Sequence, residues 1–141
     1  MGTRVDFYVL GNGGEQDRLR AACRIVEKAW QQGHMVWLTA ESERQAEQLD
    51  QLLWTFKQDS FVPHERGTEG ALTDCAVRIV APSEAPDGGV HVNVATSPLP
   101  MPLVAERVVE IIPADTDGRA AGRERFRAYR VHGYDINTHD I

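Results

Sequence analysis

The chain has 141 residues, of which 42% are hydrophobic and 26% are charged, so it is long enough for one domain with a core of its own. Its formal net charge of -6 excludes a broad cationic surface for nucleic acid or membranes, so only a local basic patch could serve such a partner. Cys23 and Cys75 lie far apart, and no segment has the long apolar run of a signal peptide or a membrane span, which predicts a cytoplasmic protein with two reduced thiols.

The N-terminal part alternates between strands and helices. RVDFYVL is rich in β-branched and aromatic residues and predicts a strand, which ends at the turn GNGG. Between residues 16 and 32, apolar side chains recur at steps of three and four, which predicts an amphipathic helix ended by Gly33. HMVWLTA predicts a second strand, and Ser42 is a suitable N-cap for a second helix, ERQAEQLDQLLWTF.

The C-terminal part is richer in strands. After a polar, irregular stretch, AVRIVA, VHVNVA and RVVEII predict three strands. A helix rich in arginine follows Asp115 and ends near Gly133, and the tail DINTHDI is expected to be extended. Strands that alternate with helices predict an α/β fold: a single three-layer α/β/α domain over residues 1–141, with a mostly parallel (mixed), open, Rossmann-like sheet.

The sequence does not predict an enzyme. GNGG is an incomplete dinucleotide-binding motif, because Gln16 stands at the third glycine position and Glu15 and Asp17 place negative charge where a phosphate would bind. The five histidines show no metal-ligand spacing, and none of the common catalytic motifs occurs. We therefore expect no cofactor, no metal and no catalytic residue, with a nucleotide-binding enzyme based on GNGG as an alternative.

The arginine-rich helix is the first candidate site. Residues 119–134 contain five arginines and one glutamate, a local charge of +4 in an acidic chain. Arg119, Arg123 and Arg127 recur every four residues and form one ridge, with Phe126 beside it. Such a ridge suits a ligand that offers carboxylates or phosphates and an apolar group. The alternative is a solvated helix face, with Phe126 and Tyr129 turned into the core.

A second candidate site lies at the end of the second helix. Trp54 is followed by Phe61, Val62 and Pro63 in an otherwise polar loop. The residues alone favour a loop that folds back onto the core, because large aromatic side chains dominate cores. The alternative is an exposed apolar patch, which would mark an interaction site.

Four stretches together, FYVL, AESERQAEQLDQLLWTF, SFVPH and RERFRAYRVHGYDIN, resemble the chi subunit family of bacterial DNA polymerase III holoenzyme. The resemblance extends from Phe7 to about Thr138 and implies a non-catalytic replication adaptor of the clamp-loader assembly. Such a subunit pairs with the psi subunit, and through psi with the clamp loader. It also binds the acidic C-terminal tail of single-stranded DNA-binding protein, which ends in an aromatic residue. It thereby tethers the holoenzyme to coated lagging-strand template, with mainly indirect contact to DNA and none to membranes.

The resemblance also implies which residues bind each partner. For the tail of single-stranded DNA-binding protein they are Arg119, Arg123, Phe126, Arg127 and Thr138. For the psi subunit they are Trp54, Phe61, Val62 and Pro63. The chain departs from the family at His139-Asp140-Ile141, which adds an acid near the basic site. The alternative function is a direct single-stranded nucleic-acid-binding module that uses the arginine helix, with an affinity that falls steeply with salt.

Overall fold

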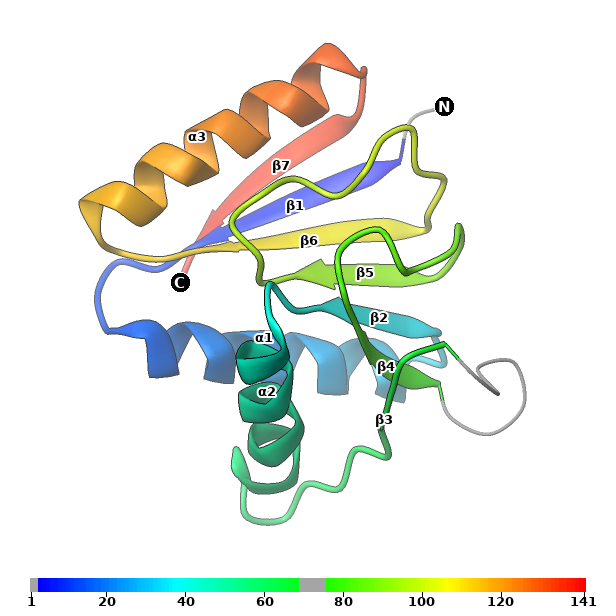
Figure 1. The fold of residues 1–141 in the computed structure, drawn as a ribbon. Coiled ribbons are helices and arrows are strands. Elements are labelled where there is room, and N and C mark those ends of the chain that lie inside the picture. Colours follow the sequence, from blue (N-terminus) through cyan, green and yellow to red (C-terminus); the bar gives the residue numbers. More distant parts are fainter. Residues whose placement is uncertain (1–2, 69–75) are drawn as a thin grey trace.

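The computed structural model describes residues 3–68 and 76–141, which form one seven-stranded sheet and three helices (Figure 1). The strands lie in the order β3-β4-β2-β5-β6-β1-β7. Their bounds are β1 Arg4–Val9, β2 Val36–Thr39, β3 Glu65–Arg66, β4 Val77–Val80, β5 Val90–Asn93, β6 Arg107–Ile112 and β7 Asp135–Asp140. The helices are α1 Glu15–Gln31, α2 Glu43–Thr55 and α3 Thr116–Val131.

The predicted α/β fold is confirmed, with one refinement of the sheet. All pairings among the described strands are parallel, whereas a partly mixed sheet was expected. The pattern of apolar residues does not predict β3, because Glu65 and Arg66 are both exposed and polar. The extended tail is β7, an edge strand that pairs with β1.

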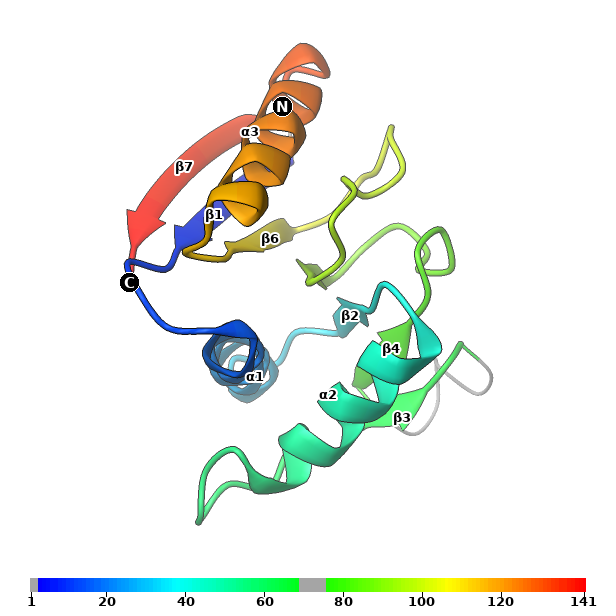
Figure 2. The same cartoon turned by 60° about the vertical axis from the view of Figure 1, so that its left-hand side comes forward.

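Helices cover both faces of the sheet, as Figure 2 shows. α1 and α2 pack on one face, around a core that includes Val26, Leu38 and Leu53. α3 packs on the opposite face above β6, β1 and β7, where Phe7 and Tyr129 belong to a second, smaller cluster. Because side chains alternate along a strand, β1 serves both faces of the sheet.

Local side-chain contacts explain where the helices begin. Ser42 is the N-cap of α2 and accepts a hydrogen bond from the Gln45 amide, as predicted. Asp115 caps α3 in the same way, through the amide of Gly118. In the GNGG turn, the Asp17 carboxylate accepts the Gly14 amide hydrogen bond at 2.9 Å. An acid of the chain itself therefore occupies this helix N-terminus, which disfavours phosphate binding there.

Two further expectations concern the cysteines and the membrane. Cys23 is a free, buried thiol, and burial raises its pKa to about 12. Cys75 lies outside the described residues. Within residues 3–68 and 76–141, the helices are too short or too polar to cross a membrane.

A buried carboxylate holds β7 on the sheet. The Asp6 side chain in β1 is fully buried on the face opposite α3, and His139 in β7 lies 3.0 Å from it. Arg107 in β6 contacts the same carboxylate at 2.5 Å, and Arg4 contacts it at 3.1 Å. Burial alone would raise the pKa of Asp6, but the hydrogen bonds from His139, Arg107 and Arg4 outweigh it and hold the pKa below its ordinary value. Asp6 therefore joins three neighbouring strands while it is ionised.

We expect Asp6→Asn to lower the free energy of unfolding by about 1–3 kcal/mol at pH 7, because the variant loses charge-assisted hydrogen bonds. A carboxyl whose pKa is lower in the folded than in the unfolded chain stabilises the fold at pH values above the unfolded-state pKa. This contribution is lost as the pH falls through the folded-state pKa. The stabilities of the two proteins should therefore converge below about pH 4. Urea unfolding across a pH series measures this. If the difference in free energy of unfolding between wild type and Asp6→Asn stays constant down to about pH 3, the charge of Asp6 is not the source of its stabilising effect.

Candidate functional site

A cavity of about 210 Å³ lies between α3 and the strands beneath it, and is called the α3 cavity below. Its lining residues are Phe7, Val9, Ile112, Arg119, Gly122, Arg123, Phe126 and Thr138. Four of the five residues predicted for tail binding are thus brought together, from α3 and from β7. Arg127, the fifth, does not line the cavity.

The floor of the α3 cavity is apolar because β1 and β6 present large side chains to α3. Phe7 lies directly opposite Thr138 in the register of β1 and β7. Its ring packs against Phe126, with 5.5 Å between the ring centroids. Gly122 lets α3 approach the sheet, since a Cβ atom there would meet Ile112 Cδ1 at 2.9 Å. The result is a shallow apolar slot between a helix and the edge strand.

The arginines around this slot differ in their contacts. Arg119 donates a hydrogen bond to the Leu10 carbonyl at 3.0 Å, so one side of its guanidinium is already fixed. Arg127 is exposed and pairs with Glu124 on the outer surface of α3. Arg123 is exposed and forms no hydrogen bond or ion pair with any described residue. Arg123 is therefore the cation at the cavity whose donors remain available to a ligand.

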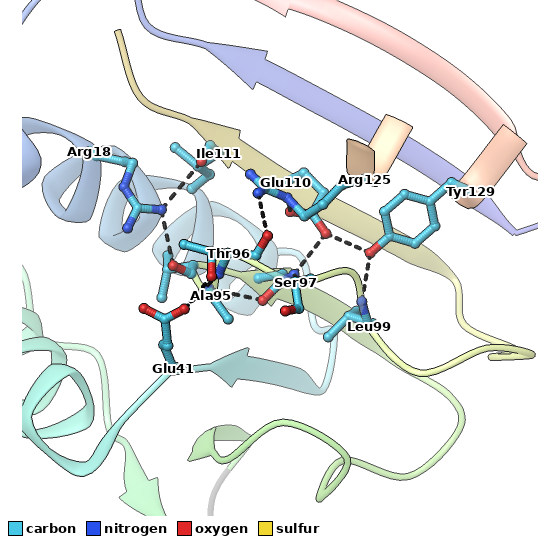
Figure 3. Close-up of polar contacts among 12 residues, drawn as sticks. Arg18, Glu41, Ala95, Thr96, Ser97, Leu99, Glu110, Ile111, Arg125 and Tyr129 are labelled. Carbon is cyan, nitrogen blue, oxygen red and sulfur yellow. Dashed lines mark hydrogen bonds and ion pairs between the residues drawn. The ribbon is translucent and has the colours of Figure 1, made fainter. Parts of the chain in front are cut away.

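The inner face of α3 contains a buried ion pair that the sequence analysis did not identify (Figure 3). Arg125 is 2% exposed, and its Nε lies 2.8 Å from a carboxylate oxygen of the fully buried Glu110 in β6. The Tyr129 hydroxyl donates to Glu110 at 2.5 Å, and Asn93 donates to it at 2.8 Å. Burial raises the pKa of Glu110, and these three donors oppose that shift. The carboxylate is thus surrounded by donors.

The same network fixes the segment between β5 and β6. Arg125 donates to the Thr96 carbonyl at 2.8 Å, and the Leu99 amide donates to the Tyr129 hydroxyl at 3.1 Å. Arg125 therefore contributes to packing, and the basic outer surface of α3 is smaller than its arginine content suggests. One signal in the sequence was available: a single acid inside the apolar strand RVVEII requires a buried partner.

A second surface lies at the end of α2. Trp54 and Phe61 are 47% and 63% exposed, and their ring centroids are 5.3 Å apart. Val62 is fully buried in the core beneath α2, and Pro63 is half-buried. The two alternatives for this loop therefore apply to different residues, because Val62 turns inward and Phe61 turns outward. Trp54, Phe61 and Pro63 are called the Trp54 patch below.

The α3 cavity and the Trp54 patch are separated by the sheet. α3 lies on one face and α2 on the other, as Figure 2 shows. Two partners could therefore bind at the same time without competing for residues. In the described part of the chain, His, Cys, Asp and Glu side chains form no group of three that could hold a metal ion.

We expect Arg125→Met to lower the free energy of unfolding by about 3–5 kcal/mol, because Glu110 would be left as a buried carboxylate without its cation. The matched control is Arg130→Met on the exposed side of the same helix. This substitution should change the free energy of unfolding by less than about 0.5 kcal/mol. Urea unfolding measures both. A second substitution, Glu110→Leu, should recover most of the loss in the Arg125→Met background. If the double variant is as unstable as the single one, the uncompensated charge is not the cause.

Comparison with known proteins identifies the family. Residues 2–137 match the family described as DNA polymerase III chi subunit, HolC. A relative from Pseudomonas aeruginosa, named DNA polymerase III subunit chi, is 36% identical, with 99% of this chain and 97% of the relative covered. The protein of the same name from Escherichia coli is 33% identical, with 94% of each covered. This chain therefore belongs to the chi subunit family of DNA polymerase III, an accessory subunit in bacterial replication.

Proposed function

We propose that this chain is an adaptor without catalytic activity that joins two proteins through two separate surfaces. The α3 cavity binds the acidic C-terminal tail of single-stranded DNA-binding protein. The Trp54 patch binds the psi subunit, which connects the chain to the clamp loader. The pair of contacts tethers the polymerase to coated lagging-strand template. The observation that carries this proposal is the α3 cavity, where the available guanidinium of Arg123 lies beside an apolar floor.

The end of an acidic tail presents two chemical groups to a binding site, a free carboxylate and a terminal aromatic side chain. Arg123 can bind the carboxylate with two parallel N–H···O bonds. Phe7 and Phe126 provide an apolar wall for the aromatic side chain. Thr138 adds a hydroxyl on the β7 side of the cavity. The acids further along the tail are attracted by the remaining charge of α3, which acts mainly on the association rate.

The contacts of the three ridge arginines assign them different roles from those that the sequence predicts. From the sequence, the carboxylate clamp is expected at Arg123 or Arg127, close to Phe126, and Arg119 is expected to act at long range. In the structure, Arg119 lines the cavity, whereas Arg127 is paired with Glu124 outside it. We therefore assign the clamp to Arg123, with Arg119 beside it, and a long-range role to Arg127.

We expect Arg123→Ala to weaken binding of a tail peptide about 30-fold, because a partly desolvated carboxylate loses its partner. Arg127→Ala should weaken it less than about threefold, as expected for an exposed ion pair. Isothermal titration calorimetry with the peptide as a free acid and as a C-terminal amide measures both effects. Wild-type protein should prefer the free acid, and Arg123→Ala should lose that preference.

Equal binding of the free acid and the amide by wild-type protein would rule out the carboxylate clamp. The same titrations with a bare single-stranded oligonucleotide test the alternative function. A nucleic-acid-binding module would bind the oligonucleotide with an affinity that falls steeply with salt. The burial of Arg125 and the pairing of Arg127 leave few cations for such a contact.

The Trp54 patch suits a protein partner because its aromatic rings are exposed and adjacent. Large exposed aromatic side chains at the centre of an interface often dominate its binding energy. We expect Phe61→Ala to weaken psi binding by about 30-fold or more, while tail binding at the α3 cavity stays unchanged. Surface plasmon resonance with immobilised psi measures this. Gln58→Ala, in the same loop and exposed, is the matched control.

Tail binding also reports whether a variant is folded, because the α3 cavity lies on the other face of the sheet. A Phe61→Ala protein that binds both the tail and psi with wild-type affinity would remove the psi contact from this patch.

A further inference from the structure

A second pocket lies on the α3 side of the sheet, next to the helix. Two loops lie on this side together with α3, as Figure 2 shows. They are the β4–β5 loop, residues 81–89, and the β5–β6 loop, residues 94–106. A cavity of about 130 Å³ lies between these loops and strands β2 and β5, and is called the loop pocket below. Its lining residues are Thr39, Ser83, Ala85, Asp87, His91, Leu99, Pro100, Pro102 and Leu103.

The loop pocket has a buried end and an exposed rim. The buried end consists of two strand residues and two leucines of the β5–β6 loop: Thr39, His91, Leu99 and Leu103. The rim consists of exposed residues from both loops: Ser83, Asp87, Pro100 and Pro102. A small solute can therefore reach the buried end from the surface, between the two loops.

Two polar atoms at the buried end have no hydrogen-bond partner. Over residues 3–68 and 76–141, three buried side-chain polar atoms lack one: Thr39 Oγ1, His91 Nδ1 and Arg78 Nε. Thr39 and His91 point away from the core beneath α1 and α2, because their strand neighbours Leu38 and Val92 belong to that core. A buried polar atom without a partner is costly. A ligand that bonds to both atoms would remove this cost.

Hydrogen bonds hold the walls of the loop pocket in place. The Asp87 carboxylate accepts a hydrogen bond from the Val104 amide at 3.1 Å, and the Gly88 amide donates to the Val104 carbonyl at 2.6 Å. These bonds join the two loops to each other. The Leu103 amide donates to the Tyr134 hydroxyl at 2.8 Å, which joins the β5–β6 loop to the segment that follows α3. The pocket is therefore already formed before a ligand arrives, as is usual for small-molecule sites.

The size and lining of the loop pocket define the ligand. A cavity of about 150 Å³ accepts a single benzene ring, so this slightly smaller pocket suits one small ring. Leu99 and Leu103 give the ring apolar surfaces to pack against. A hydroxyl group both donates and accepts hydrogen bonds. It can therefore bond to the Thr39 hydroxyl and to His91, whichever ring nitrogen of the histidine carries the proton.

An uncharged ligand fits the loop pocket better than an ion does. Burial holds the pKa of His91 below its ordinary value, and the carbonyls of Gly88 and Pro86 do not overcome this effect. His91 is therefore neutral at pH 7 and provides no charge for an anion. Asp87 is the only acidic residue that lines the pocket, and it lies at the exposed rim. The buried end thus offers no carboxylate to a cation.

We propose that the loop pocket binds an uncharged small molecule with one ring and a hydroxyl group, about the size of phenol. The hydroxyl group lies between Thr39 and His91, and the ring packs against Leu99 and Leu103. The loop pocket shares no lining residue with the α3 cavity or with the Trp54 patch. The inference is therefore independent of the partners proposed for those two surfaces.

Phenol and benzene are matched probes for this site, because they differ only in the hydroxyl group. Nitrogen-15 NMR titrations of the full chain show where each probe binds, from the amides that shift, and give both dissociation constants. We expect phenol to shift the amides of Thr39, Ala85 and Leu103, with a dissociation constant of about 1 mM or below. Benzene should bind about tenfold more weakly, because it leaves Thr39 and His91 without a partner.

Thr39→Val replaces the hydroxyl with a methyl group of similar size. It should reduce the preference for phenol over benzene from about tenfold to about threefold or less, while benzene binds at least as tightly as to wild type. Urea unfolding should find the variant no less stable than wild type, because Thr39 Oγ1 has no partner to lose among the described residues. The matched control is Thr55→Val, an exposed threonine of α2 on the other face of the sheet, which should keep the tenfold preference.

Three results would overturn the proposal. Amide shifts confined to the α3 cavity, around Phe126 and Thr138, would show that the ring binds there instead. Equal affinities of wild type for phenol and benzene would show that the buried polar atoms do not contact the probe. If neither probe shifts the amides that line the loop pocket, the pocket takes up only solvent.

Discussion

The ion pair between Glu110 and Arg125 sets the position of α3, and much of the candidate tail-binding site follows from that position. Both side chains are almost completely buried, so the pair can exist only where β6 and α3 bring their charged atoms together. Tyr129, one turn further along α3, contacts the same carboxylate and so fixes the rotation of the helix. With the inner face fixed in this way, Arg123 and Phe126 come to lie at the edge of the sheet. Arg125 and Tyr129 therefore serve packing, Arg123 stays available at the candidate site, and Phe126 both packs against Phe7 and lines the cavity.

The parallel sheet explains why the chain can present two independent surfaces. Each crossover connection in such a sheet places its helix on one face or the other. α1 and α2 follow β1 and β2 on one face, and α3 follows β6 on the opposite face. The sheet and its buried side chains lie between these two faces, so the two surfaces share no residue. The proposed adaptor role depends on this separation, because neither partner would then cover the residues that bind the other.

Most elements of the fold could be predicted from the sequence because their apolar residues recur with a clear period. β3 could not, since two exposed polar residues form a strand only through pairing with β4. Arg123, Arg125 and Arg127 are identical in type and close in sequence, and only the rotation of α3 relative to β6 distinguishes a free, a buried and a paired arginine. The partner of Arg125 lies 15 residues away on another element. In the same way, neighbouring apolar residues Phe61 and Val62 turn in opposite directions, and no periodic pattern in a loop indicates which one is exposed.

The pairing of β1 has a consequence for how the chain acquires this fold as it is synthesised. β1 is made early, yet its two neighbours are β6 and β7: Arg4 lies opposite Arg107 on one side and Asp135 on the other. β1 therefore leaves the ribosome long before either neighbour exists. One of its edges stays unpaired until β6 is made, and the other until β7 has followed α3. Contacts between such distant residues form slowly, and unpaired strand edges can associate with other chains. The α1 and α2 layer can assemble on β2, β4 and β5 in the meantime, so the half of the molecule that carries α3 is completed last.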